Sequence, residues 1–378
     1  MTCAVVGIGR TPYSKRSGRT TRAMAVDACR GALDDAGLGI EAVDGMCTFH
    51  VNDSAQPIEV AWALGRDELA WANGMYGGGN LVADQIATAA AVVEAGLCRA
   101  VLVYRSLNGR SGHRFGTVEG PMQVAGDGQF DAASGFLVPP QWFAMWARRH
   151  QHIYGSTCED LGQIAVTQRA HAGPNPHATR REPLSMEEYL AGRWINEPFR
   201  VYDCTSEVDG AVAVLIAGEG VARDCRQPPV WLLGSSNSQS GAGWCTWEDP
   251  TQMYARFAAP RIWERTGLRP SDMDFACMYD CFTYTVMATM EAYGFCEKGQ
   301  VGNFFAEGRA TYSGDVVVNP HGGLLSEGYI HGLNHHYEAA LQLRGAAGAR
   351  QVPDARRALV TAGGGPYGGA NIYSSEHP

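Results

Sequence analysis

The sequence predicts an α/β protein built from two duplicated halves, with a large insertion in the first half. Three observations predict it: a strand–helix–strand frame that recurs, two Ala-rich helices that each precede a Val- and Leu-rich strand, and a long irregular middle segment. Alternation of strands and helices is typical of mostly parallel, buried sheets covered by helices. We expect the halves to span residues 1–225 and 226–378, with the insertion at about 106–196.

The first frame begins with an apolar strand over residues 1–9. A helix is expected to start at Thr20 or Thr21, because either hydroxyl can accept a hydrogen bond from the first turn. Gly37 is a natural stop for this helix. A second strand is expected over residues 43–49.

The second frame repeats this order, with a strand at 230–233, a helix at 253–265 that stops at Gly267, and a strand at 275–279. Residue identities recur at one constant offset. Gly37, Leu38, Asp44 and Cys47 are matched by Gly267, Leu268, Asp274 and Cys277. Identities at one offset within one frame favour an internal duplication.

The two Ala-rich helices are expected at residues 81–94 and 335–343, before strands at 100–104 and 358–361. The middle segment is rich in Gly, Pro, His and Arg, and we expect one helix in it, near residues 140–154. Long ordered loops are usually functional. This segment is therefore either a cover over a site or a contact between two copies of the chain.

Composition limits the classes of function. The chain has 378 residues, 45% hydrophobic and 18% charged, with a net charge of −9, which disfavours nucleic-acid and anionic-membrane surfaces. No run approaches the ~20 apolar residues of a membrane span, and the start has no charged leader. The 11 cysteines are scattered without a Cys-x-x-Cys pair, which favours reduced thiols in the cytoplasm and no metal site.

Four segments rich in glycine and tyrosine carry the chemical information: Asn73–Gly79, Met278–Phe282, Asn319–Gly332 and Thr361–Ala370. Their order and spacing, over nearly the whole chain, resemble the thiolase superfamily and in particular its sterol-carrier-protein-type branch. This resemblance implies a layered αβαβα fold of two duplicated halves.

Thiolases present a nucleophilic cysteine at a helix N-terminus, where the helix dipole favours a thiolate. By resemblance, Tyr76 stands at that position, Tyr279 replaces an oxyanion-hole histidine, and Tyr329 replaces the histidine that activates the cysteine. Tyr76 either takes part in the chemistry or fills the vacated space. Cys281 matches a cysteine that serves as acid and base in that branch, although it can also be a buried structural thiol.

Tyrosines thus stand at three positions where thiolases have Cys, His and His. This pattern resembles the lipid-transfer-protein-type steroid side-chain aldolases. The resemblance implies retro-aldol cleavage of a 17-hydroxy-3-oxo-pregnene-20-carboxyl-CoA type of thioester into a 17-ketosteroid and propionyl-CoA. No acyl-enzyme is needed, so the nucleophilic cysteine is dispensable. Two alternatives stay open: a thiolase or acyltransferase that uses Cys281 or another thiol, and a non-catalytic subunit that binds lipid or acyl-CoA.

A phenol can donate to an oxyanion and act as acid or base. We expect Tyr329 to take the hydroxyl proton and Tyr279 to protonate the enolate carbon. A protonated His321 or His331 close to Tyr329 would lower its pKa, whereas a surface position or a loop-fixing role is the alternative for either. Asp280 is expected either to orient Tyr279 or to stabilise the start of the next helix.

The thiolase layout also makes the backbone N–H groups near Gly78 and Gly368 candidates to polarise the thioester carbonyl. Basic residues at 180–181 could contact coenzyme A phosphates, and those at 148–150 could do so or form a solvated helix face. Coenzyme A is expected only as part of the substrate, with no separate cofactor. The resemblance further implies a homodimer formed by edge strands, and a small OB-fold and zinc-ribbon partner protein.

Overall fold

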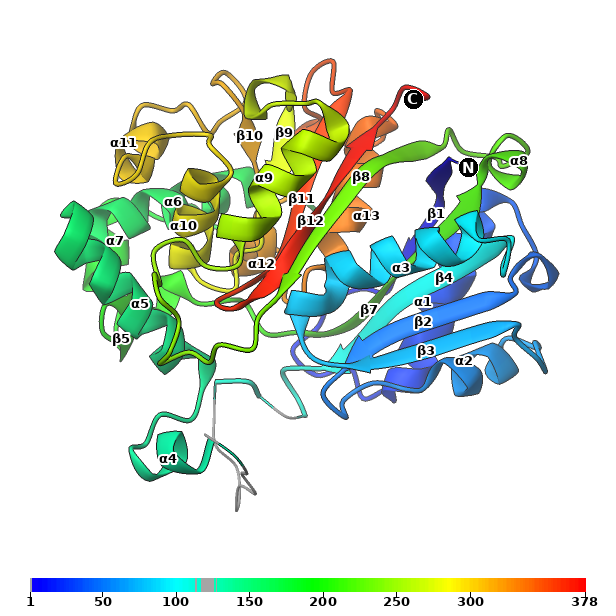
Figure 1. Cartoon of the computed structure of the whole chain (residues 1–378), viewed down its shortest axis with the longest axis horizontal. Coiled ribbons are helices and arrows are strands. Elements are labelled where there is room, and N and C mark those ends of the chain that lie inside the picture. The colour runs from blue at the N-terminus through cyan, green and yellow to red at the C-terminus, as the bar shows by residue number, and fades with distance from the viewer. Residues whose placement is uncertain (1, 113, 117–125, 127) are drawn as a thin grey trace.

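Ten strands form one mixed sheet in the order β10-β9-β11-β12-β8-β1-β7-β4-β2-β3, in a computed structural model that describes residues 2–112, 114–116, 126 and 128–378 (Figure 1). The ten strands are β1 (Cys3–Arg10), β2 (Gly45–His50), β3 (Trp71–Tyr76), β4 (Ala100–Asn108), β7 (Asp209–Gly218), β8 (Val230–Gln239), β9 (Phe275–Cys277), β10 (Val317–Val318), β11 (Arg357–Gly364) and β12 (Tyr367–Ser374). A separate hairpin contains β5 (Trp194–Asn196) and β6 (Phe199–Arg200).

The sheet consists of two five-stranded halves with the same internal order, β1-β7-β4-β2-β3 and β8-β12-β11-β9-β10. They meet where β1 pairs with β8 through Ala4 opposite Trp231 and Val5 opposite Val230. This repeated topology accounts for the repeated sequence frame. It also places β3 and β10 at the two edges of the sheet.

The helices around the sheet are α1 (Thr21–Ala36), α2 (Pro57–Ala63), α3 (Val82–Glu94), α8 (Glu219–Ala222), α9 (Ala255–Thr266), α10 (Thr283–Ala292), α11 (Val301–Ala306), α12 (Gly323–Ser326) and α13 (Leu333–Leu343). Three buried apolar clusters separate the layers. One joins α1 to the first half-sheet, a second contains α3 and α13 between strands of both halves, and a third joins α9 and α10 to the second half-sheet. The fold is therefore layered α/β, with α3 and α13 at its centre.

The predicted helix ends are confirmed in both frames. The Thr20 hydroxyl accepts a hydrogen bond from the backbone N–H of Ala23, which caps α1. Gly37 and Gly267 end α1 and α9 with φ of 73° and 67°, a conformation in which a side chain would be strained. No helix in the described residues is long and apolar enough to cross a membrane.

The prediction of mostly parallel sheets is wrong. Five neighbouring pairs are antiparallel, namely β1/β7, β1/β8, β4/β7, β8/β12 and β11/β12. Four of them involve β7 or β12, which follow no helix–strand alternation and were not expected as strands. β12 lies in the glycine-rich tail, and glycine is a residue type depleted in strands.

The middle segment is more helical than predicted. Besides the expected α5 (Pro139–Tyr154), it contains α4 (Gly128–Ala133), α6 (Cys158–Ala172) and α7 (Met186–Ala191). The start of α6 carries a recognisable signal, because Thr157 caps the backbone N–H of Asp160 while the Asp160 carboxylate accepts from Thr157. Helix α6 packs on α10, α11 and α12, so the insertion covers the second half-sheet.

Candidate active site

A cavity of about 1250 Å³ lies where the four segments converge. Tyr76, Gly78, Tyr279, Tyr329 and His331 all line it. Tyr76 is the last residue of β3, and the other four residues follow β3, β9 or β10, which belong to both halves of the sheet. The cavity is therefore completed by both halves together.

Two tyrosine hydroxyls meet inside the cavity. The phenol oxygens of Tyr279 and Tyr329 lie 3.0 Å apart and share a hydrogen bond. Tyr279 is fixed just after β9, since its backbone N–H donates to the hydroxyl of Thr361 at 2.8 Å. The backbone N–H of Tyr329 donates to the carbonyl of Ser206 at 2.9 Å. The two side chains predicted as an acid/base pair are thus brought into direct contact.

The ring of Tyr279 is held between two glycines, one in the loop before α3 and one at the start of α13. A Cβ on Gly79 would lie 2.0 Å from the Tyr279 hydroxyl oxygen. A Cβ on Gly332 would lie 2.9 Å from the Tyr279 ring, and Gly332 has a φ of 84°. Both positions therefore require glycine for this tyrosine to occupy its place. Both glycines end segments that the sequence marks as part of the site, but no sequence pattern indicates their contact with Tyr279.

Burial raises the pKa of both phenols. Tyr279 is 3% exposed, and its pKa lies well above the ordinary value because of burial and then of Tyr329. The pKa of Tyr329 is also raised, by burial and then by Cys281. Both hydroxyls therefore carry their protons at neutral pH.

His331 lies beside Tyr329, with ring centroids 4.7 Å apart in an edge-on arrangement. Its Nδ1 accepts from Nε and Nη2 of Arg105 at 3.0 and 2.9 Å, and Nη2 of Arg105 also contacts Asp53 at 2.6 Å. Burial and then Arg105 lower the pKa of His331 to about 3. His331 is therefore neutral, and the expectation that a protonated His331 activates Tyr329 is wrong.

Arg105 and Asp53 were not predicted as site residues from the sequence. Arg105 is fully buried on β4, and Asp53 follows β2. Their link to His331 joins distant segments and leaves no local motif. The available signal was a charged residue directly after the apolar run at 100–104, since a buried arginine requires partners.

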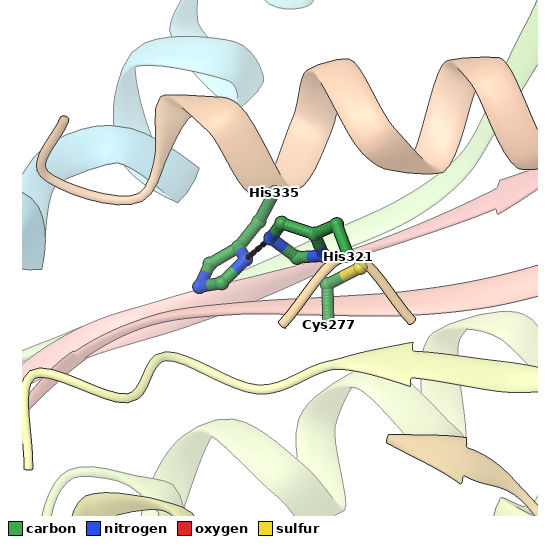
Figure 2. A group of neighbouring side chains, drawn as sticks. All are labelled: Cys277, His321 and His335. Carbon is green, nitrogen blue, oxygen red and sulfur yellow. Dashed lines mark hydrogen bonds between the residues drawn. The ribbon is translucent and has the colours of Figure 1, made fainter. Parts of the chain in front are cut away.

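His321 lies outside the cavity lining, in a buried network. Its Nε2 shares a hydrogen bond of 3.0 Å with Nδ1 of His335 (Figure 2). Burial lowers the pKa of His321 to about 3, so the expectation of a protonated His321 beside Tyr329 is also wrong. Nε2 of His335 lies 3.2 Å from an Asp280 oxygen, which extends this network to the residue after Tyr279.

Asp280 stabilises a helix other than the one expected. Its two carboxylate oxygens accept from the backbone N–H groups of Leu324 and Leu325, at 2.8 and 3.1 Å. These groups belong to the start of α12, whereas α10 was the helix predicted to be stabilised. Asp280 therefore fixes the loop that leads to Tyr329.

Cys277, His321 and His335 place three possible metal-ligand atoms within 4.8 Å of one another (Figure 2). A thiolate and two imidazoles are donors that zinc and copper accept. However, burial raises the pKa of the Cys277 thiol, and a thiol must lose its proton to bind a metal. The hydrogen bond between the two imidazoles already satisfies one nitrogen of each ring. The cluster thus fits a hydrogen-bonded support better than a metal centre.

The remaining predicted residues are placed as follows. Cys281 lines the cavity, but burial raises the pKa of its thiol. Tyr76 is 73% exposed at the cavity mouth. Gly368 is not among the lining residues, and a Cβ there would contact Tyr254. The part of this hairpin that lines the cavity is Gly363, Gly364 and Tyr367.

The cavity wall combines aromatic and cationic side chains. Trp142, Phe143, Trp244 and Phe282 supply a large apolar surface. The lining also contains five positively charged residues: Lys15, Arg110, Arg114, Arg180 and Arg193. Of the predicted phosphate contacts, only Arg180 reaches the cavity. Arg148 instead pairs with Glu197, and His150 is buried against Glu291.

Comparison with known proteins agrees with this architecture. Residues 236–373 match the family described as "Thiolase C-terminal domain-like". A solved structure described as "Ltp2-ChsH2(DUF35) aldolase" superposes with a TM-score of 0.93 at 35% identity, covering 100% of this chain and 98% of that one. The fold and the site thus define a protein of the thiolase superfamily.

Two curated relatives narrow the family. "17-hydroxy-3-oxo-4-pregnene-20-carboxyl-CoA lyase" of Mycobacterium tuberculosis is 37% identical over 379 residues, with 96% of each chain covered. "Steroid side-chain-cleaving aldolase" of Thermomonospora curvata is 36% identical over 382 residues, covering 96% of this chain and 95% of the relative. The chain belongs to the steroid side-chain-cleaving aldolases of the thiolase superfamily.

Proposed function

We propose that this protein is a carbon–carbon lyase that cleaves the side chain of a steroid acyl-CoA by a retro-aldol reaction. The substrate carries a hydroxyl on C17 and a thioester on the attached three-carbon side chain, as in 17-hydroxy-3-oxo-4-pregnene-20-carboxyl-CoA. The products are a 17-ketosteroid and propionyl-CoA. The observation that carries the proposal is the contact between the Tyr279 and Tyr329 hydroxyls inside the cavity, 3.0 Å apart.

The tyrosine pair can move one proton without forming a free phenolate. The substrate hydroxyl gives its proton to the Tyr329 oxygen, the Tyr329 proton passes to Tyr279, and the Tyr279 proton goes to the enolate carbon. The bond between C17 and the side chain breaks, its electron pair moves to the side-chain carbon, and C17 becomes a ketone. Because each phenol gains and loses one proton, the raised pKa values of both residues are compatible with this relay.

The cavity suits both ends of such a substrate. Its volume of about 1250 Å³ exceeds the ~300–1,000 Å³ of ordinary ligand pockets. The aromatic wall formed by Trp142, Phe143, Trp244 and Phe282 favours a flat apolar body. The cations Lys15, Arg110 and Arg193 are exposed and favour the phosphates of coenzyme A.

The test is Tyr279→Phe and Tyr329→Phe, each assayed for ketosteroid and propionyl-CoA. Loss of an acid/base group typically costs about 100- to 10,000-fold, so we expect kcat to fall in that range while the variants stay folded and bind substrate. Tyr373→Phe is a control, because this tyrosine is equally buried but contacts His336 outside the cavity. Near wild-type turnover in both site variants would refute the proposed mechanism.

The pH profile separates a relay from a phenolate base. A required phenolate would make kcat rise steadily as pH increases towards the pKa of its tyrosine. Since burial holds the pKa of both tyrosines above the ordinary ~10, we expect kcat to be flat between pH 7 and pH 9. A continuous tenfold rise per pH unit across this range would contradict the relay.

Cys281 favours a second candidate, an acyl transfer through a thioester on the enzyme, because it lines the cavity. Its raised pKa opposes thiolate formation, so this candidate is the weaker one. Acyl transfer predicts acetyl-CoA release that requires free CoA, and an acylated Cys281 detectable by mass spectrometry. Retained lyase activity in Cys281→Ala would exclude it. A non-catalytic binding subunit would instead bind steroid acyl-CoA without any turnover.

We further propose that the protein is a homodimer in the cytoplasm. We also propose that it binds a small partner protein with an OB-fold and a zinc ribbon. The edge strand β3 lies beside the exposed Ile58 and Trp62 of α2, which supports pairing with a second copy. Exposed Met145, Ile153 and Trp194 on α5 and β5 give the insertion an apolar surface for a partner. All eleven cysteines are free, as expected in a reducing compartment. Light scattering and co-expression with such a partner test the assembly.

A further inference from the structure

We propose that His331, fixed in one tautomer by Arg105, donates its Nε2–H to the thioester oxygen that becomes the enolate oxygen. This inference rests on the proposed retro-aldol function and assigns an electrostatic role that the two tyrosines leave open. Both tyrosine hydroxyls are needed for the proton relay. The charge that develops on the thioester oxygen therefore requires another donor.

Hydrogen bonding determines the tautomer of His331. Nε and Nη2 of Arg105 lie 3.0 and 2.9 Å from Nδ1 of His331. A guanidinium group has only donors, so Nδ1 must be the acceptor and carry no proton. Because Nδ1 carries no proton and the imidazole is neutral, its single N–H proton is on Nε2. The pKa of His331, lowered to about 3 by burial and then by Arg105, is in agreement.

Arg105 is itself held firmly. Its side chain is fully buried; Nη2 pairs with an Asp53 oxygen at 2.6 Å, and Nη1 donates to the carbonyl of Ser106 at 3.1 Å. Burial raises the pKa of Asp53, but Arg105 outweighs this effect and keeps that pKa below its ordinary value. A buried cation with a paired carboxylate has little freedom to release His331. Arg105 is therefore a positioning residue for the imidazole.

The donor nitrogen lies at the correct part of the cavity. A Cβ on Gly78 would lie 4.0 Å from Nε2 and Cε1 of His331, so this edge of the imidazole faces the Gly78 loop. Both residues line the cavity, as do Tyr279 and Tyr329. His331 also has a φ of 50°, an uncommon conformation for a residue with a side chain, followed by Gly332 at 84°. This turn directs the ring into the site.

The chemistry balances without ionisation of His331. As the carbon–carbon bond breaks, its electron pair is delocalised from the side-chain carbon onto the thioester oxygen. His331 retains its proton and stabilises that oxygen through a hydrogen bond. When Tyr279 protonates the carbon, the thioester C=O bond re-forms and its oxygen loses the negative charge. The hydrogen bond from His331 then weakens. A neutral imidazole suits this role because it donates a hydrogen bond strongly without losing its proton.

The first test compares His331→Ala with His331→Gln, whose side-chain amide can place an N–H near the position of Nε2. Removal of one oxyanion donor typically lowers kcat about 100-fold or more. We expect this loss in the Ala variant with little change in KM, and recovery by about tenfold or more in the Gln variant. His336→Gln is the burial-matched control, since His336 is also 1% exposed but contacts Tyr373. Its kcat should equal that of the wild type.

The second test is Arg105→Met, read from the pH dependence of kcat. Without Arg105, burial still lowers the pKa of His331 but the smaller contribution of Arg105 is lost, so this pKa should rise from about 3 and kcat should show an ionisation at a higher pH than in the wild type. The double variant Arg105→Met/His331→Gln should lose that ionisation. A merely structural role for Arg105 would lower stability without shifting the ionisation.

The outcomes separate this inference from the proposed function. If the wild type, co-expressed with the proposed OB-fold partner, produces no ketosteroid and propionyl-CoA, the proposed function fails. If the wild type is active and folded His331→Ala retains kcat within about threefold, the assignment of His331 is overturned while the function stands. A Gln variant as slow as the Ala variant, or an unchanged pH profile in Arg105→Met, would also overturn it.

Discussion

The two halves of the molecule use equivalent loops in different ways. In the first half, five residues (77–81) connect edge strand β3 to central helix α3; in the second half, residues 319–332 connect edge strand β10 to central helix α13. The short loop approaches Tyr279 with Gly79, whereas the long loop supplies the side chains of Tyr329 and His331. One topological position thus provides backbone in one half and reactive side chains in the other.

This difference also separates Tyr76 from Tyr329. Tyr76, at the end of β3, is 73% exposed, whereas Tyr329 is partly buried and its hydroxyl is hydrogen-bonded to that of Tyr279. Two tyrosines that look alike in the sequence therefore occupy different environments. The first loop shapes the site, and the second loop carries its proton chemistry.

Among the changes that compare the two loops, Gly79→Ala should lower kcat most, because it disrupts the contact of the short loop with Tyr279. The added Cβ would meet the Tyr279 hydroxyl at 2.0 Å and displace it from Tyr329. A displacement of ~1 Å can cost about 100-fold, so we expect kcat to fall by that factor or more. Gly220→Ala in α8 is the control, since nothing lies within 4 Å of its Cβ position. Unchanged turnover in folded Gly79→Ala would show that Tyr279 tolerates displacement.

The long loop and α13 should make stability depend on pH. Burial lowers the pKa of His321, His331 and His336 to about 3, below the ~6.5 of an unfolded chain. Their neutral forms are thus favoured by folding, so stability is full above pH 6.5 and is lost as pH falls towards 3. Three protons taken up on unfolding give a slope of at most about 4 kcal/mol per pH unit.

Urea unfolding at pH 7, 6 and 5 measures this slope. His336→Gln should remove about one of the three protons, and so reduce the slope by about a third. The short loop contains no titratable residue between Gly77 and Leu81, so it contributes nothing to this effect. An identical slope in wild type and His336→Gln would contradict the assignment of a buried neutral imidazole.

Tyr76→Phe should have the smallest effect and sharpens the contrast with Tyr329→Phe. Because the Tyr76 side chain is 73% exposed at the cavity mouth, loss of its hydroxyl should change kcat by less than about threefold. A loss comparable to that of Tyr329→Phe would place Tyr76 in the proton chemistry. Steady-state assays of both variants under one set of conditions decide between these roles.

Much of the site was predictable because the four segments have fixed positions along a repeated frame. Tyr76, Gly78, Tyr279 and Tyr329 were expected at one site, and they share one cavity. Gly368 was misplaced because a glycine-rich stretch does not reveal which residues of a hairpin turn face the cavity. Here β11 and β12 continue through the glycines, and pairing extends to Gly364 opposite Tyr367.

Protonation states were the harder part to predict. A histidine near a tyrosine was expected to be charged, but complete burial makes the neutral form more stable at His321 and His331. The contact of Arg105 with His331 spans 226 positions in the chain, so no local pattern encodes it. Sequence patterns identify which residues meet, whereas the low dielectric of the interior decides which of them carry charge.

The position of Tyr279 between the two halves has a consequence for a chain divided into two fragments. Its hydroxyl touches Gly79 of the first half, its ring touches Gly332 of the second, and the half-sheets meet through two residue pairs. Neither half alone contains a complete site. Activity should therefore report on association: two fragments of the chain would be inert when separate and would regain turnover only as they reassemble.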